Sequence, residues 1–115
     1  MFRRKLKKFL HTSNIEYTRD WRIPGTVFIV DYYLPEYNLA IDYLGMLHPS
    51  EEYLRIILYM RRQFIKVRLC KEKRISLIET CQAENDYFCT KLVETLHLIK
   101  ALGYIQEIIN PFQGV

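Results

Sequence analysis

The stretch Val27-Phe-Ile-Val-Asp-Tyr-Tyr-Leu-Pro-Glu-Tyr-Asn-Leu-Ala-Ile-Asp-Tyr-Leu-Gly45 decides the fold of this 115-residue chain. Two strand-like runs, residues 27–34 and 39–44, flank residues 35–38, whose Pro, Glu, Tyr and Asn favour a turn. The stretch therefore predicts a β-hairpin. If residue 34 closes the hairpin opposite residue 39, Asp31 lies directly opposite Asp42.

Asp31 and Asp42 form a candidate metal site. Opposed residues in a hairpin have Cβ atoms roughly 4.5–5.5 Å apart, and like charges there are destabilising. Each carboxylate also interrupts an apolar run, where an unpaired charge is costly, and a divalent cation between the two would remove both penalties. In the alternative interpretation, one Asp caps a turn or pairs with one of the 17 basic residues. A one-residue slip of the hairpin would also move one carboxylate to the opposite face.

Length and composition indicate one ordinary domain, residues 1–115. Half of the residues are hydrophobic and 14% are aromatic, which argues against disorder. The three cysteines, Cys70, Cys81 and Cys89, are an odd number without CxxC spacing, so we expect reduced, structural cysteines in an intracellular, cytoplasmic protein. No apolar run is long enough to span a bilayer, so we expect no membrane partner.

The order of predicted elements is α-β-β-β-α-β-α, which indicates an α/β fold with a central mixed sheet flanked by helices. The expected elements are a basic helix at 1–10, a three-stranded meander over 15–44, a helix at 50–73, a strand at 75–79, a helix at 84–102 and a tail at 104–115.

Two face assignments follow from periodicity. In the first strand, alternate residues are expected to share one face, and they are Ile15, Tyr17, Arg19, Trp21 and Ile23. In the helix at 50–73, the expected core positions are Leu54, Ile57, Leu58, Ile65 and Leu69, and the expected off-core positions are Arg55, Arg61, Arg62, Lys66 and Arg68.

The chain is mildly basic, with a net charge of +4 and an isoelectric point near 9.0. Five basic residues lie within the first eight positions, and they are Arg3, Arg4, Lys5, Lys7 and Lys8. Such a cluster suits a polyanion, most often nucleic acid. The alternative is a solvated helix face.

The segment from Val30 to Gly45 resembles the core motif of the PD-(D/E)xK nuclease superfamily, in particular small members similar to very-short-patch-repair endonucleases and helicase-associated nuclease domains. Those members commonly read Pro-Asp-Phe-x-Leu-Pro-Glu, then Ile-Glu, an aromatic or acidic position and Gly. Residues 70–79, Cys-Lys-Glu-Lys-Arg-Ile-Ser-Leu-Ile-Glu, are similar to the family's closing helix turn and the strand after it. The resemblance covers roughly residues 15–79 and implies a restriction-endonuclease-like fold.

The resemblance also implies a site and an activity. Its metal ligands would be Asp31, Asp42 and the backbone carbonyl of Tyr43, holding Mg²⁺ with Mn²⁺ as a substitute. The reaction would be hydrolysis of DNA phosphodiesters by metal-activated water. The family lysine normally sits two residues after the second carboxylate, where this chain has Leu44. In some members the lysine comes from the following helix, and counting back from the match at residues 75–79 places Lys66 at that position. The alternative is that Lys66 is a solvated basic residue of the helix.

Other positions match less completely. His48 has the Gly-x-x-His spacing of a proton-transfer residue in the resembling members, or it is an ordinary loop residue. Glu79 is a further carboxylate near the metal or a strand-end charge. The family's Pro before the first Asp is Val30, and the first helix lacks the usual Glu.

The resulting prediction is a Mg²⁺-dependent DNA endonuclease whose first helix, with Arg61 and Arg62, contacts the phosphate backbone. The alternative is a decayed nuclease fold acting as a nucleic-acid-binding or protein-interaction module. We also expect a homodimer, because cutting both strands of a duplex most simply needs a symmetric pair.

Overall fold

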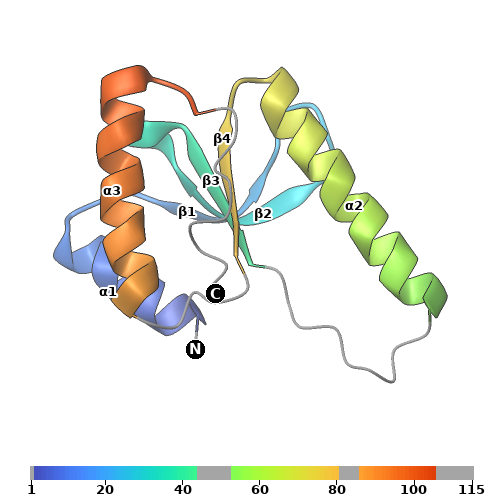
Figure 1. Cartoon of the computed structure of the whole chain (residues 1–115), viewed down its shortest axis with the longest axis horizontal. Helices are drawn as coiled ribbons and strands as arrows, with labels where there is room; N and C mark the ends of the chain where they lie inside the picture. The colour runs from blue at the N-terminus through green and yellow to red at the C-terminus, as the bar shows by residue number, and fades with distance from the viewer. Residues whose placement is uncertain (1, 44–52, 81–85, 106–115) are drawn as a thin grey trace.

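A four-stranded sheet lies between helices on its two sides in the computed structural model, which describes residues 2–43, 53–80 and 86–105 (Figure 1). The elements in chain order are α1 Phe2–Thr12, β1 Thr18–Arg22, β2 Ile29–Leu34, the 3-10 turn η1 Pro35–Tyr37, β3 Leu39–Tyr43, α2 Tyr53–Glu72, β4 Ser76–Thr80 and α3 Asp86–Leu102. This is the predicted order, and the protein is a small α/β domain.

The sheet is mixed, as predicted. Its strand order is β1-β2-β3-β4. The first three strands form an antiparallel meander, and β4 pairs parallel to β3. A parallel pair needs a crossover connection, and α2 supplies it.

The hairpin register is also as predicted. Leu34 pairs with Leu39, and Tyr32 pairs with Ile41. The turn between the strands is η1, which ends at Asn38 in the left-handed conformation with φ of 48°. Asn tolerates this conformation better than most residues do, which explains its place in the turn.

Asn38 also fastens the hairpin to β4. Its side-chain amide Nδ2 donates to the carbonyl of Arg74 at 3.0 Å. Its own carbonyl accepts from the N–H of Ser76 at 3.2 Å. The turn therefore fixes where the fourth strand begins.

Two apolar clusters cover the two faces of the sheet. The cluster shared with α1 and α3 contains Leu6, Leu10, Tyr32, Leu34, Leu39, Ile41, Ile78, Phe88, Leu92, Leu96 and Ile99. The cluster on the α2 side is smaller and contains Ile23, Val30, Ala40, Cys70 and Ile75. Figure 1 shows the same division, with α1 and α3 on one side of the sheet and α2 on the other.

The first strand differs from its prediction. It begins at Thr18, and the expected common face is wrong, because Tyr17 packs on the α1 and α3 cluster whereas Trp21 packs on the α2 cluster. Asp20 lies between them with φ of 50°, a left-handed conformation that interrupts the alternation of a regular strand. Trp21 then stacks on Tyr33, with ring centroids 3.7 Å apart.

The face assignment of α2 is wrong for its first half. Leu54, Ile57 and Leu58, which were expected in the core, are all exposed. Among the described side chains of α2, Cys70 near its end is the one that is fully buried, and the Cys70 carbonyl accepts from the N–H of Ile75 at 2.8 Å. In Figure 1 the helix leans away from the sheet toward its N-terminal end. The predicted helix start at 50–52 lies outside the described residues.

The beginning of the predicted tail docks on the sheet. The N–H of Ile105 donates to Oγ of Ser76 at 3.0 Å, and the guanidinium of Arg74 lies 4.7 Å from the ring centre of Tyr104. Residues 106–115 lie outside the described part of the chain. None of the described helices is both long enough and apolar enough to cross a membrane.

Candidate functional site

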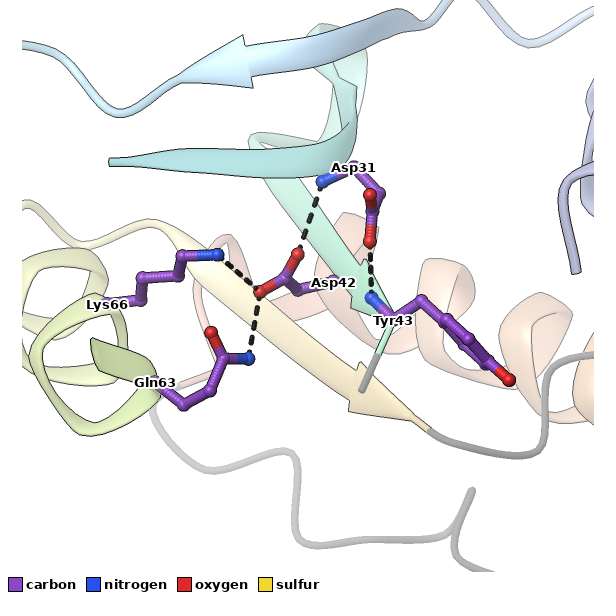
Figure 2. A network of polar contacts seen from close by, with 5 residues as sticks. All are labelled: Asp31, Asp42, Tyr43, Gln63 and Lys66. Atoms are coloured by element: carbon purple, nitrogen blue, oxygen red, sulfur yellow. Dashed lines mark hydrogen bonds and ion pairs between the residues drawn. The ribbon is translucent and has the colours of Figure 1, made fainter. Parts of the chain in front are cut away.

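Asp31 of β2 and Asp42 of β3 lie next to the paired residues Tyr32 and Ile41 of the hairpin, and each binds the opposite strand through its side chain. Oδ1 of Asp42 accepts from the N–H of Asp31 at 3.3 Å, and Oδ2 of Asp31 accepts from the N–H of Tyr43 at 2.7 Å (Figure 2). Each carboxylate therefore binds the backbone of the opposite strand. This reciprocal arrangement brings the two predicted carboxylates together at the end of the hairpin.

Helix α2 adds two donors to the same place. Nζ of Lys66 and Nε2 of Gln63 both lie 3.1 Å from Oδ2 of Asp42 (Figure 2). Gln63 and Lys66 are three residues apart, so they share one side of the helix. The side chain of Lys66 is 13% exposed and that of Asp42 is 6% exposed. The expectation that Lys66 lies off the core is therefore wrong, and the structure brings it to the two carboxylates.

Burial opposes the ionised form of Asp42. It raises the pKa of the carboxyl, and the negative charge of Asp31 acts in the same direction. The positive charge of Lys66 and the hydrogen bonds from Gln63 and Lys66 act in the opposite direction, but they do not outweigh burial. The ionised carboxylate is thus only partly compensated by its protein neighbours.

Glu79 adds a third carboxyl group to this region. It pairs with Asp42 in the register of β3 and β4. Burial raises the pKa of Glu79, repulsion from Asp42 raises it further, and Lys66 lowers it. Asp42 therefore lies close to two other carboxyl groups, Asp31 and Glu79, and to the ammonium group of Lys66.

The donor set also restricts how a cation could bind. Within the described ranges, no group of three or more His, Cys, Asp or Glu side chains could hold a metal ion. Oδ2 of Asp42 is already engaged by Lys66 and Gln63. Mg²⁺ is commonly held through one or two carboxylates with several retained waters, whereas Ca²⁺ takes more protein oxygens. A cation at this place would therefore be held by fewer than three such side chains of the described residues and would keep several waters.

Cys70 is a buried cysteine near the site. The residue is 1% exposed, and burial raises the pKa of its thiol to about 11, with smaller contributions from the charges of Asp42 and Glu79. A thiol in that state is not a nucleophile at neutral pH. The sequence-based interpretation of Cys70 as a structural cysteine agrees with this environment.

The basic residues of the first helix lie on the other side of the sheet from Asp42. Lys5, Lys7 and Lys8 are exposed on α1, whose Leu6 and Leu10 pack into the α1 and α3 cluster. The side chains of Arg3 and Arg4 lie outside the described part of the chain. The structure therefore does not bring α1 together with the carboxylates.

The remaining predicted residues are distributed as follows. Arg61 and Arg62 are both exposed on α2, and Arg62 precedes Lys66 by four residues, which places it one turn away on the same side. The N–H of Tyr43 binds Asp31, and the role of its carbonyl stays a prediction. His48 and Leu44 lie outside the described residues.

Gln63 is the site residue that the sequence analysis missed. Its signal was its spacing, three residues before Lys66 on the same helix. An amide on a helix with many polar residues is not distinctive by itself. Only the position of Asp42 on a strand 21 residues earlier makes Gln63 part of the site.

Comparisons of the chain with models of protein families, with curated proteins and with solved structures found no match.

Proposed function

We propose that this α/β domain has the restriction-endonuclease-like fold and acts as a Mg²⁺-dependent DNA endonuclease. The observation that carries the proposal is the contact between Nζ of Lys66 and Oδ2 of Asp42 at 3.1 Å. It joins the two hairpin carboxylates to the helix lysine that the motif resemblance implied. An ordinary solvated lysine would not be 13% exposed against a buried carboxylate.

In this proposal, Asp31 and Asp42 hold the cation together with the carbonyl of Tyr43. The bound ion would lower the pKa of a water molecule and offset charge on the phosphate under attack. Lys66 stabilises the negative charge that develops on the phosphate oxygens. Gln63 keeps the Asp42 carboxylate in place, and Arg62 contacts the phosphate backbone one turn from Lys66.

A second candidate function is a nucleic-acid-binding or protein-interaction module built on a decayed nuclease site. Its support is that both carboxylates already accept protein hydrogen bonds, from the N–H groups of Asp31 and Tyr43 and from Gln63 and Lys66. In that case the network holds the ends of β2 and β3 together and needs no cation.

Calorimetry and cleavage assays separate the two functions. Mg²⁺ and Mn²⁺ are titrated into the wild-type chain and into Asp42→Asn, and plain, nicked and branched duplexes are then incubated with each protein. The enzyme binds the metal ions only with Asp42 intact, cleaves at least one duplex and stops when EDTA is added. A decayed module binds DNA equally well with and without Asp42 and cleaves none of the duplexes.

A further inference from the structure

Helix α2 exposes a row of large apolar side chains that the candidate site does not use. The row consists of Ile57, Met60, Phe64 and Val67, and the most exposed of them are Phe64 at 63% and Met60 at 62%. They follow one another at intervals of three, four and three residues, so they share one side of the helix. We call these four residues the α2 seam. A contiguous row of exposed apolar side chains usually marks an interaction surface.

The spacing of the α2 seam indicates that its partner is a helix. Intervals of three and four residues are the repeat by which two paired helices pack against each other. Leu54 and Leu58 are also exposed, but they lie on another side of α2 and do not extend the row. The interface is therefore small, and interfaces that bury less than about 1,200 Å² are typical of transient complexes.

Two arginines lie beside the α2 seam. Arg61 comes four residues after Ile57 and three before Phe64, and Arg68 comes four residues after Phe64. Side chains three and four residues apart are neighbours on a helix, so both arginines border the seam. Both are exposed. They are seven residues apart, which aligns them along the helix as a row of positive charge parallel to the apolar one.

Almost no negative charge on α2 offsets this row. Glu72 is the one acidic residue in the sequence of the helix, Tyr53–Glu72. Its Oε1 lies 3.7 Å from a guanidinium nitrogen of Arg68, and both side chains are more than half exposed. An ion pair that is so open to solvent contributes little and is easily replaced by another carboxylate. The border of the seam is therefore suited to an acidic partner.

We propose that the α2 seam binds an acidic amphipathic helix of another protein. The apolar side chains of that helix pack on the seam, and Glu or Asp residues spaced seven apart pair with Arg61 and Arg68. Charge disfavours a second copy of this chain as the occupant, because two copies would bring like-charged arginines together. The apolar row disfavours DNA, because contacts with phosphates use charged and polar side chains.

The probe is a fluorescent helical peptide of about three heptads with Leu at the a and d positions and Glu at the e and g positions. A matched peptide carries Lys in place of every Glu. Each is titrated with the full chain and followed by fluorescence anisotropy, without DNA or metal, so that the result does not depend on the proposed activity. We expect the acidic peptide to bind with a dissociation constant of roughly micromolar order and more weakly as salt rises. The lysine peptide should bind at least about tenfold more weakly.

Substitutions in the chain locate the contact. Phe64→Glu and Met60→Glu should each weaken binding of the acidic peptide at least about tenfold. Arg61→Gln should weaken it several-fold and reduce the difference between the two peptides. Arg62→Gln is the matched control, because it removes an equal charge from the next residue, which is not three or four residues from any member of the seam. Circular dichroism checks that each variant keeps the wild-type unfolding midpoint.

Several results would overturn the proposal. They are no binding of the acidic peptide, equal binding of both peptides, and binding that Phe64→Glu and Met60→Glu leave unchanged. A duplex whose affinity falls in Phe64→Glu would assign the surface to DNA instead. A self-association in sedimentation equilibrium that Phe64→Glu abolishes would assign it to a second copy of the chain.

Discussion

Replacing Lys66 with Met is the sharpest perturbation of the proposed active site. Met keeps most of the length of the lysine side chain and removes the ammonium group that lies 3.1 Å from Oδ2 of Asp42. If that group stabilises charge on the phosphate in the transition state, its loss should slow cleavage roughly 10²–10³-fold, or about 3–4 kcal/mol. DNA affinity should change little, because the expected role lies in the reaction rather than in docking.

The same substitution should affect stability in a pH-dependent way. Lys66 is one of the groups that lower the pKa of Asp42, so its removal raises that pKa further above the usual value. At neutral pH the variant must keep a less compensated carboxylate buried, at a cost of about 1–3 kcal/mol. A carboxyl group whose pKa is higher in the folded than in the unfolded chain takes up protons on folding. The lost stability should therefore return as the pH falls through the folded pKa.

Single-turnover cleavage and fluorescence anisotropy measure rate and affinity separately, and urea unfolding at neutral and acidic pH measures stability. Arg62→Met is the matched control, because it removes an equal charge one turn earlier on the same side of α2. It should reduce affinity and lower the salt slope of binding by about one, with the single-turnover rate unchanged. If both variants lose only affinity, Lys66 is a phosphate contact, and the decayed-module function replaces the enzyme.

Three further predictions concern the neighbouring groups. Asp42→Asn and Asp31→Asn should each abolish cleavage of a duplex, and Ca²⁺ should support DNA binding without turnover; full activity in either variant would contradict the site assignment. Glu79→Gln should raise the unfolding temperature at neutral pH, because burial and Asp42 both disfavour the ionised form, and a lower temperature would contradict that environment. Alkylation of Cys70 at pH 8, followed by mass spectrometry, should be far slower in the folded than in the unfolded chain, because the Cys70 thiol is buried and its pKa is about 11. Equal rates would mean that this part of α2 opens readily.

The hairpin was predictable from sequence because its determinants are local. The turn residues 35–38 fix the loop length, and loop length fixes the register, so Leu34 had to meet Leu39 once the turn formed. The closeness of Asp31 and Asp42 follows directly from that register. The hydrogen bonds by which each carboxylate binds the backbone of the other strand were not predictable, because they depend on how the strands separate beyond Tyr32 and Ile41.

The packing of α2 was not predictable for a different physical reason. Periodicity identifies which residues share a side of a helix, but it does not say which side is covered when apolar residues occur on more than one. Here Leu54, Ile57 and Leu58 remain exposed, while Lys66 turns inward toward Asp42. The electrostatic partner lies on a strand 24 residues earlier, beyond the reach of a local pattern.

These two features of α2 are connected. Gln63 and Lys66, in the second half of the helix, both bind Oδ2 of Asp42 on the sheet. Leu54, Ile57 and Leu58, in the first half, stay exposed. The polar contacts with Asp42 therefore help to fix the second half of α2 on the sheet. The residues of the candidate site are thus part of what positions the helix that carries them.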